Sequence, residues 1–209
     1  MGALVVFDLD GVLIDSEEAN VEAFSQGLQA LGLQRPPASD VASLIGLSAS
    51  EMLARLGCPE DRIADVFGDV VKPYYLENLH RLARPMPDAA EVLEELRKRG
   101  HRLVACTSGD RSTQEKALQQ IGLLDYLEAM QTPDDSEFRK PQVEYLKELL
   151  QRVGYKGKVI HVEDSQVGLQ MGLDFGATTV FAEYGYGSPG PWQPHYRITA
   201  LNQLLEVVQ

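Results

Sequence analysis

Apolar and polar residues follow two different patterns along this chain, and segments with the two patterns alternate. Short uninterrupted apolar runs, typical of strands buried on both faces, occupy residues 3–7, 102–106, 159–162 and 178–182. Between them, apolar residues recur at spacings of three and four, as Val21, Phe24, Leu28 and Leu31 do, which is typical of an amphipathic helix. This second pattern predicts helices over residues 17–31, 87–99, 112–121, 143–153, 165–175 and 201–208.

Polar residues at the predicted helix starts support these boundaries. Ser16 is placed to cap the first helix with its hydroxyl group. The pairs Ser48/Glu51 and Ser112/Glu115 have the spacing of a capping box, in which each side chain bonds the backbone amide of the other residue. These pairs predict helices that begin at Ser48 and at Ser112.

Strands that alternate with helices predict an α/β fold, a Rossmann-like parallel sheet with helices on both faces. Residues 33–82 interrupt this order, because they contain helix-like segments and no convincing strand. We therefore expect two domains, a core of residues 1–15 and 85–209 and an inserted helical cap of residues 16–84. A stretch rich in Gly and Pro, residues 184–196, predicts a long loop after the last strand.

Composition narrows the class of partner. The 209 residues carry a formal net charge of −12 and a pI near 4.7, which argues against nucleic acid and anionic membrane surfaces. No apolar run approaches the length of about 18 residues that a membrane span needs. Cys58 and Cys106 are too few for a disulfide framework, which favours a reducing, cytoplasmic location. Nothing in the sequence demands more than a monomer.

Acidic and hydroxyl residues follow three of the predicted strands. Ligands of parallel sheets bind at the carboxyl ends of the strands, so these residues are expected to converge at one edge. Four carboxylates so close together would repel one another and raise their pKa values, and a divalent cation resolves the repulsion. Oxygen ligands favour Mg²⁺. The residues after the strand ends are Asp8, Asp10, Thr107, Ser108, Gly109, Glu163 and Asp164.

A bound cation at this edge would hold an anion, and the other groups there fit a phosphate. Lys140 and the amides around Ser108 and Gly109 would neutralise the remaining charge of the phosphate. Asp8 could then attack phosphorus, because Mg²⁺ and Lys140 screen its charge. Asp10, which lies two residues further on, could protonate the leaving oxygen and later activate a water molecule.

These residues resemble the four motifs of the haloacid dehalogenase-like hydrolase superfamily, in the same order. The matching stretches are DLDGV at residues 8–12, Thr107-Ser108, Lys140-Pro141 and Glu163-Asp164-Ser165, and the resemblance extends from about residue 3 to residue 182. The helical insertion after the first motif resembles the C1 cap of that superfamily.

The resemblance implies a Mg²⁺-dependent phosphatase that acts on a small phosphorylated metabolite. It implies that Asp8 forms an aspartyl-phosphate, that Asp10 acts as acid and base, and that Thr107 and Lys140 hold the phosphate. It also implies a Mg²⁺ site, whose ligands are Asp8, the Asp10 carbonyl, Asp164 and, in or beside the coordination sphere, Glu163.

Two other functions stay open. The stretch EDSQVG at residues 163–168 looks like β-phosphoglucomutase and its phosphatase relatives. Asn20 and Ala49, however, stand where the mutase pattern has a histidine and an arginine, which favours hydrolysis over a phosphosugar mutase. The other alternative is a non-enzymatic phospho-receiver or binding module. A receiver draws its acidic pair and its phosphorylated aspartate from different strands, which DLDGV does not fit.

Substrate choice is expected to depend on the cap. The resemblance points to the loop Gly46-Leu47-Ser48 as the cap segment that faces the active site, and Asn20 and Lys72 are the polar cap residues that we nominate next. Candidate substrates include phosphoglycolate, sugar phosphates and phosphogluconate-like acids.

Several other residues are expected to have a structural rather than a chemical role. His161 is expected to be a core histidine whose hydrogen bonds are satisfied. Gly168 and Gly172, four residues apart on one helix, are expected to let that helix approach the sheet closely. Tyr184 and Tyr186 are expected to pack within the loop.

Overall fold

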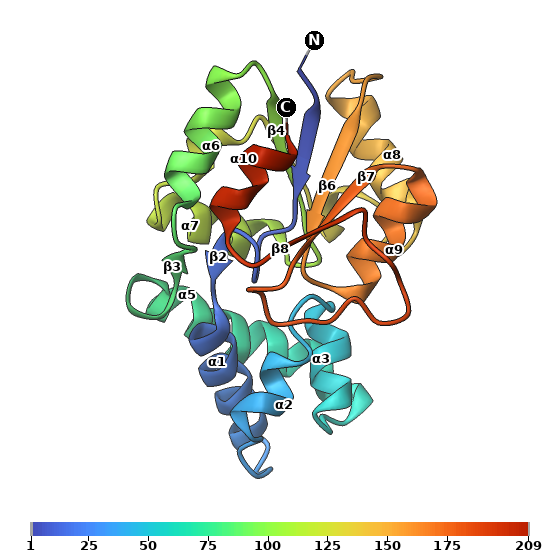
Figure 1. The fold of residues 1–209 in the computed structure, drawn as a ribbon. Helices are drawn as coiled ribbons and strands as arrows, with labels where there is room; N and C mark the ends of the chain where they lie inside the picture. The colour runs from blue at the N-terminus through green and yellow to red at the C-terminus, as the bar shows by residue number, and fades with distance from the viewer. Residues whose placement is uncertain (1, 209) are drawn as a thin grey trace.

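The computed structural model describes residues 2–208, and a six-stranded parallel sheet forms the centre of its core (Figure 1). The sheet order is β5-β4-β1-β6-β7-β8, and in the two central pairs Phe7 lies opposite Ala105 and Val162. The strands are β1 (Leu4–Phe7), β4 (Arg102–Cys106), β5 (Ala129–Gln131), β6 (Val159–Glu163), β7 (Thr178–Ala182) and β8 (Tyr196–Ile198).

Helices cover both faces of this sheet, and alternate side chains of β1 accordingly enter two different apolar clusters. Val5 and Phe7 pack in the larger cluster, while Leu4 and Val6 pack in a second one with Tyr145. The expected doubly covered α/β core is therefore confirmed. Its helices are α6 (Ala89–Lys98), α7 (Arg111–Gln120), α8 (Val143–Arg152), α9 (Gln166–Phe175) and α10 (Leu204–Val207), with short 3-10 turns at Leu124–Tyr126, Pro133–Asp135 and Leu201–Gln203.

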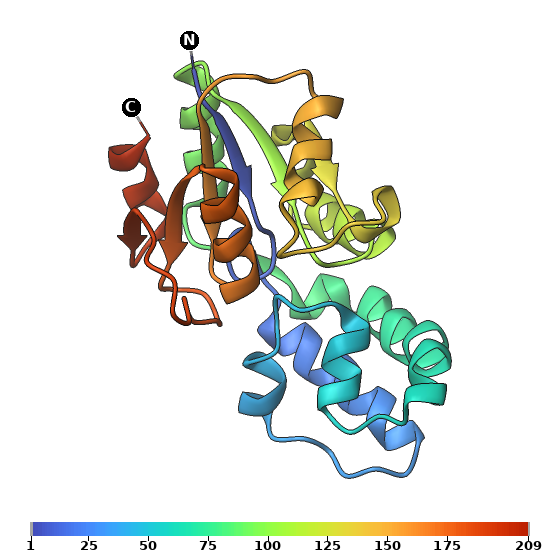
Figure 2. The same cartoon turned by 90° about the vertical axis from the view of Figure 1, so that its right-hand side faces the viewer.

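The inserted segment is helical and lies beyond the end of the sheet toward which the strands point (Figure 2). Two short connecting strands, β2 (Ile14–Asp15) and β3 (Arg84–Pro85), pair antiparallel where the insertion leaves the core and returns to it. The limits of the two domains stay a prediction. The inserted elements are α1 (Glu17–Ala30), α2 (Ala38–Ala42), α3 (Ala49–Arg55), a 3-10 turn (Glu60–Arg62), α4 (Ile63–Val66), the π-helical turn η2 (Phe67–Val71) and α5 (Lys72–Leu82).

Helix starts test the capping predictions. The capping box of Ser48 and Glu51 is confirmed. The box of Ser112 and Glu115 is wrong, because α7 begins at Arg111 and the Asp110 side chain caps it by accepting from the Thr113 amide. The helix at residues 165–175 begins as expected, with Ser165 accepting from the amide of Gly168.

The hydrophobic pattern missed the two-residue connecting strands β2 and β3 and also two strands of the central sheet, β5 and β8. β5 is only three residues long, and β8 forms the end of the stretch that was expected to be a loop, so the loop prediction is wrong at its last residue, Tyr196. Both lie at the edges of the sheet, where one side has no neighbouring strand and burial is lower.

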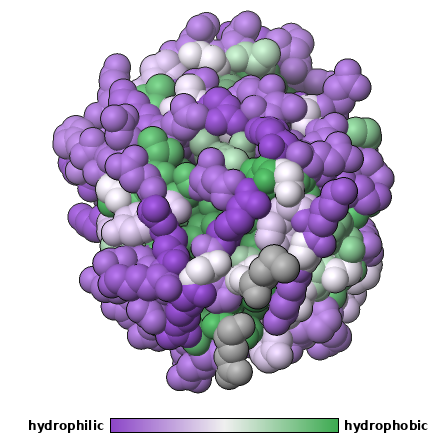
Figure 3. All heavy atoms as spheres, turned by 90° about the horizontal axis from the view of Figure 1, so that it is seen from above, coloured by the Kyte–Doolittle hydropathy of each residue, from purple (hydrophilic) through white to green (hydrophobic). Residues whose placement is uncertain are grey.

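The outer end of the core, opposite the cap, is mainly hydrophilic. Figure 3 shows that purple side chains cover most of this face, with apolar ones between them. Within residues 2–208, none of the helices is both long and apolar enough to cross a membrane.

Candidate active site

The carboxyl ends of β1, β4 and β6 meet at the edge of the sheet that faces the cap. The hydrogen-bond ladder continues one residue past two of these strands, since the Asp8 amide donates to Val162 O (2.9 Å) and the Thr107 amide to Gln131 O (3.0 Å). The backbone therefore fixes where the side chains of Asp8 and Thr107 leave the sheet. Both residues are almost completely buried, with 2% and 1% of their surface exposed.

Lys140 lies between two carboxylates at this edge. Its Nζ donates to Asp8 Oδ1 (2.8 Å) and to Glu163 Oε1. Burial disfavours the charged ammonium, but the charges of Asp8 and Glu163 together hold the pKa of Lys140 well above its usual value. Lys140 therefore provides a fixed positive charge beside Asp8.

Glu163 is held from both of its oxygens. Oε1 accepts from Lys140, and Oε2 accepts from Ser165 Oγ (3.0 Å). The helix α9 covers it closely, because a β-carbon at Gly168 would lie 2.0 Å from Glu163 Cδ, as the sequence predicted. Burial, followed by the charge of Asp8, raises the pKa of Glu163 to about 8. Because both of its oxygens are already bonded, Glu163 is better placed to position Lys140 than to bind Mg²⁺ directly.

His161 lies deeper on the same strand, also beneath α9. A β-carbon at Gly172 would lie 2.5 Å from its Nδ1, so the predicted close approach holds here too. The expectation of satisfied hydrogen bonds is wrong, since neither ring nitrogen has a partner in the described part of the chain. Nε2 is 3.4 Å from Glu163 Oε1, and burial with the charge of Lys140 lowers the pKa of His161 to about 3. The neutral ring fills the space under the acidic cluster.

Asp8, Glu163 and Asp164 form a buried acidic cluster, with ligand oxygens within 4.8 Å of one another. Asp164 Oδ2 accepts from the Tyr186 amide (2.8 Å), whereas its buried Oδ1 has no hydrogen-bond partner among residues 2–208. Burial and the charge of Asp8 raise the pKa of Asp164 to about 7. A divalent cation would remove this repulsion and take the unpartnered oxygen, and an all-oxygen donor set fits Mg²⁺.

The Asp10 carboxylate accepts hydrogen bonds from two neutral donors. Ser16 Oγ donates to Oδ1 (2.5 Å) and Gln114 Nε2 donates to Oδ2 (2.7 Å). Burial raises the pKa of Asp10, and the hydrogen bond from Ser16 opposes this rise. Ser16 precedes α1 without a side-chain cap bond, so that predicted role of its hydroxyl is wrong. The Asp10 carbonyl as a Mg²⁺ ligand stays a prediction.

Gln114 is a site residue that sequence reasoning missed. A β-carbon at Gly109 would lie 2.2 Å from Gln114 Nε2, so the glycine opens the path from α7 to Asp10. The glycine is visible in the sequence, but its partner is not. The Gly109 amide, expected to face phosphate, donates instead to Thr107 Oγ1 (3.1 Å), while Ser108 lines the cavity.

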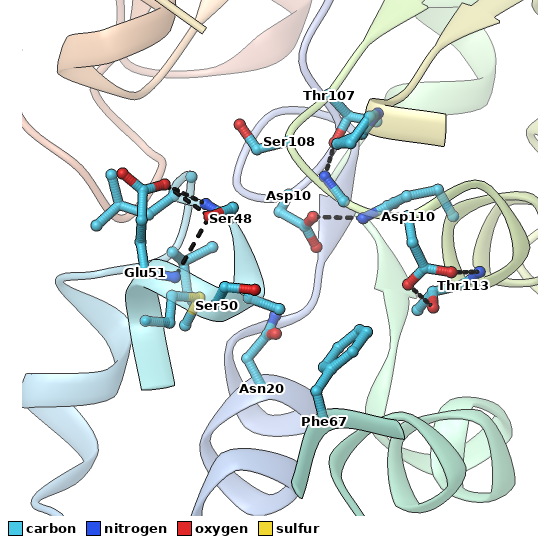
Figure 4. A pocket seen from close by; sticks show the side chains of 18 of the residues that line it. Asp10, Asn20, Ser48, Ser50, Glu51, Phe67, Thr107, Ser108, Asp110 and Thr113 are labelled. Carbon is cyan, nitrogen blue, oxygen red and sulfur yellow. Dashed lines mark hydrogen bonds between the residues drawn. The ribbon is translucent and has the colours of Figure 1, made fainter. Parts of the chain in front are cut away.

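A cavity of about 480 Å³ lies between this edge and the cap (Figure 4). All four nominated cap residues line it, namely Asn20, Gly46, Ser48 and Lys72. Asn20 Nδ2 donates to Ser16 O (3.0 Å) and Ser16 Oγ (3.2 Å), so it contacts the residue that donates to Asp10. Ser48 Oγ donates to Glu51 Oε2 (2.6 Å) and stays within the cap.

An ion pair joins cap and core across the cavity. Lys72 Nζ lies 2.8 Å from Asp110 Oδ1. Burial alone would raise the pKa of Asp110, but hydrogen bonds from Lys72, Thr113 and Ser112 hold it below its usual value. The Asp110 carboxylate of this pair therefore stays charged at neutral pH.

Tyr186 connects the acidic cluster with the start of the cap. Its hydroxyl accepts from the amides of Ser16 (2.9 Å) and Glu17 (3.2 Å) and donates to Asp15 Oδ1 (2.9 Å). Its own amide donates to Asp164. Tyr186 therefore makes contacts beyond the packing within its loop that the sequence predicted. Tyr184 reaches the core, where its hydroxyl donates to Val12 O (3.0 Å).

Comparison with known proteins places this site in a family. The haloacid dehalogenase-like hydrolase family profile matches residues 5–182. A phosphoglycolate phosphatase of Aquifex aeolicus is 25% identical over 98% of this chain and 96% of its own, and the pyrophosphatase PpaX of Bacillus cereus is 24% identical over 98% and 95%. The crystal structure of a predicted phosphoglycolate phosphatase from Haemophilus somnus has a TM-score of 0.89 at 24% identity and covers 100% of this chain and 98% of that one.

The chain belongs to the haloacid dehalogenase-like hydrolase family. Within that family it is a phosphatase, an enzyme of the class to which these relatives belong. The resemblance stated from the four motifs and the helical insertion is thereby confirmed.

Proposed function

We propose that the chain is a Mg²⁺-dependent phosphatase that hydrolyses a small phosphorylated metabolite through an aspartyl-phosphate on Asp8. The observation that carries the proposal is the contact of Asp8 with Lys140 at 2.8 Å, on a cavity wall that also holds Asp10. A carboxylate with a fixed cation beside it can act as a nucleophile, and a second, offset carboxylate can move protons.

Two steps return the enzyme to its starting state. First, an Asp8 oxygen bonds to phosphorus, the bond from phosphorus to the ester oxygen breaks, and Asp10 gives its proton to that leaving oxygen. Burial raises the pKa of Asp10 and so favours the acid form that this step needs. Second, Asp10 takes a proton from a water whose oxygen bonds to phosphorus, the bond to Asp8 breaks, and inorganic phosphate leaves.

The surrounding groups would hold the phosphoryl oxygens. Thr107 and Ser108 lie on the cavity wall beside Lys140, where a hydroxyl group or an ammonium can donate to these oxygens. Bound Mg²⁺ would supply further positive charge against the phosphate. Its proposed ligands are Asp8, Asp164 and the Asp10 carbonyl.

Hydrolysis fits the cap better than transfer to a second sugar phosphate. Asn20 and Ala49 both line the cavity, so neither position brings the histidine or arginine of the mutase pattern to it. The Asn20 amide donates to Ser16. Phosphoglycolate and pyrophosphate, named in the relatives, are the first substrates to test.

The test is Asp8→Asn, which keeps the size of the side chain and removes the nucleophilic charge. Phosphate release from a panel of phosphorylated metabolites with Mg²⁺ should fall by at least about a thousandfold. Asp69→Asn, at an exposed cap position, is the matched control and should keep full activity. Undiminished release by Asp8→Asn would remove the proposed mechanism.

We also propose a cytoplasmic location and a monomer. Cys58 and Cys106 are both unpaired and buried, which suits a reducing compartment. Burial raises the pKa of Cys106 to about 12, so this thiol takes no part in the proposed chemistry.

A further inference from the structure

The cap side of the cavity is formed around an irregular helical turn. The π-helical turn Phe67–Val71 connects α4 to α5, and Phe67, Val71, Lys72 and Tyr75 all line the cavity. Figure 4 shows the Phe67 ring rising from its helix toward the pocket, across from Asp10 and Ser108. Turns of this kind are rare and occur frequently at functional sites. The turn thus presents an aromatic ring where the group attached to a bound phosphate would lie.

The rest of the cap wall carries several large apolar side chains next to the polar residues Ser48, Ser50 and Glu51. Phe24, Ile45, Leu47 and Met52 line the cavity together with Phe67 and Val71. A volume of about 480 Å³ is well beyond what a phosphate alone occupies and lies in the range of pockets for small organic ligands. The additional space is therefore suited to an apolar group.

The cations at the cavity are already engaged. Lys140 is held by Asp8 and Glu163, and Lys72 is paired with Asp110 at 2.8 Å. A second anionic group on the substrate that approached Lys72 would lie close to the Asp110 carboxylate, whose like charge would oppose its binding.

Arg139 is the remaining cation on the wall, and it belongs to the core side. Its guanidinium donates to the backbone carbonyls of Ser136 and Phe138, and the residue is exposed to solvent. It does not supply a cation to the cap wall.

We propose that this site selects phosphomonoesters whose leaving group is apolar and uncharged, and that Phe67 is the residue that determines this selectivity. The inference rests on the proposed function for the phosphate half of the site. It differs from the substrates in the relatives' names, because phosphoglycolate and pyrophosphate each carry a second anionic group.

Unreactive phosphonates test this inference apart from catalysis. Isopentylphosphonate and phosphonopropionate have the same number of non-hydrogen atoms in the organic group. They differ at its end, where isopentylphosphonate has an apolar isopropyl group and phosphonopropionate has a carboxylate. Calorimetric titration with Mg²⁺ should show isopentylphosphonate binding at least about tenfold more tightly, since each buried methylene contributes up to about fourfold. Tighter binding of phosphonopropionate would overturn the inference.

Substitutions identify the residue responsible. Phe67→Ala should weaken isopentylphosphonate binding by about tenfold and leave methylphosphonate binding unchanged. Tyr74→Ala, which removes a partly buried cap aromatic that does not line the cavity, is the matched control and should change neither ligand. Equal weakening of both phosphonates by Phe67→Ala would overturn the role of Phe67.

Hydrolysis assays separate this inference from the proposed function. If isopentylphosphonate binds as expected and no phosphomonoester releases phosphate, the proposed reaction fails while the binding preference stands. If phosphoglycolate is turned over with higher kcat/KM than isobutyl phosphate and phosphonopropionate also binds more tightly, the reaction stands and the selectivity proposal fails.

Discussion

Three ionisable side chains at the catalytic edge, Lys140, Asp10 and Asp164, have neighbours of different kinds, and this difference separates their charge states. Lys140 is held between carboxylates and stays charged. Asp10 is held by the neutral donors Ser16 and Gln114, with burial raising its pKa. Asp164 is held by a backbone amide on one oxygen only. One edge can therefore provide a fixed cation, an acid that gains and loses a proton, and an open ligand oxygen.

His161 should make the free energy of unfolding fall at acid pH. Its pKa is lowered to about 3 in the folded chain, against about 6.5 when unfolded, so the unfolded state binds the proton first. The contribution of His161 to the free energy of unfolding is fully present above its pKa in the unfolded chain. It is lost as the pH falls from there toward its pKa in the folded chain. Between about pH 7 and pH 5 this single group should cost about 2 kcal/mol.

The measurement is urea unfolding of His161→Leu at several pH values in EDTA. The variant should lose about 2 kcal/mol less than the wild type over that interval, whatever its stability at neutral pH. His80→Gln, at an exposed histidine, should follow the wild type. Identical pH dependence in His161→Leu and the wild type would show that His161 is not held neutral.

At the scale of elements, the loop after β7 holds the start of α1 through the Tyr186 hydroxyl group. Tyr186→Phe removes the acceptor of the Ser16 and Glu17 amides but keeps the Tyr186 amide that holds Asp164. Hydrogen exchange at those two amides should therefore accelerate by about tenfold, while the affinity for Mg²⁺ stays unchanged.

Tyr184→Phe is the matched control, because its hydroxyl donates to Val12 O in the core. It should leave exchange at Ser16 and Glu17 as in the wild type. Equal acceleration in both variants would mean that the loop as a whole, rather than the Tyr186 hydroxyl, protects the start of α1.

The sequence could predict the elements whose burial leaves a pattern. β1 and β6 are buried along their whole length, so continuous apolar runs revealed them. β8 carries an exposed Tyr196 and lies at the edge of the sheet, so its three residues have neither an apolar run nor a clean alternation. β5 has the same short length and edge position.

The same limit applies to the site. Asp8, Thr107 and Asp164 follow strands that the hydrophobic pattern reveals, so their convergence at one edge of the sheet could be expected from the sequence alone. Gln114 and Tyr186 reach the site from positions 104 residues after Asp10 and 171 residues after Asp15, through contacts that only the packed fold creates. No local spacing could have indicated either of them.

At the scale of the whole molecule, the proposed Mg²⁺ site would couple folding to ion binding. Asp8 and Asp164 come together only when β1 and β6 pair, so Mg²⁺ should bind the folded chain and not the unfolded one. At a concentration about tenfold above its Kd, the ion should add about 1.4 kcal/mol and raise Tm by about 3–6 °C.

Asp164→Asn should change Tm in opposite directions without and with Mg²⁺. Without Mg²⁺ at about pH 8, the Asp164 carboxylate, whose pKa is raised to about 7, is charged and repelled by Asp8, so its removal should raise Tm. With Mg²⁺, the variant lacks the unpartnered ligand oxygen, so its Tm should no longer respond to the ion and should fall below that of the wild type. Asp69→Asn, an exposed change of the same charge, should shift with Mg²⁺ as the wild type does. An equal Mg²⁺ shift in Asp164→Asn and the wild type would place the ion elsewhere, because the repulsion among these buried acids would then have been relieved without Asp164.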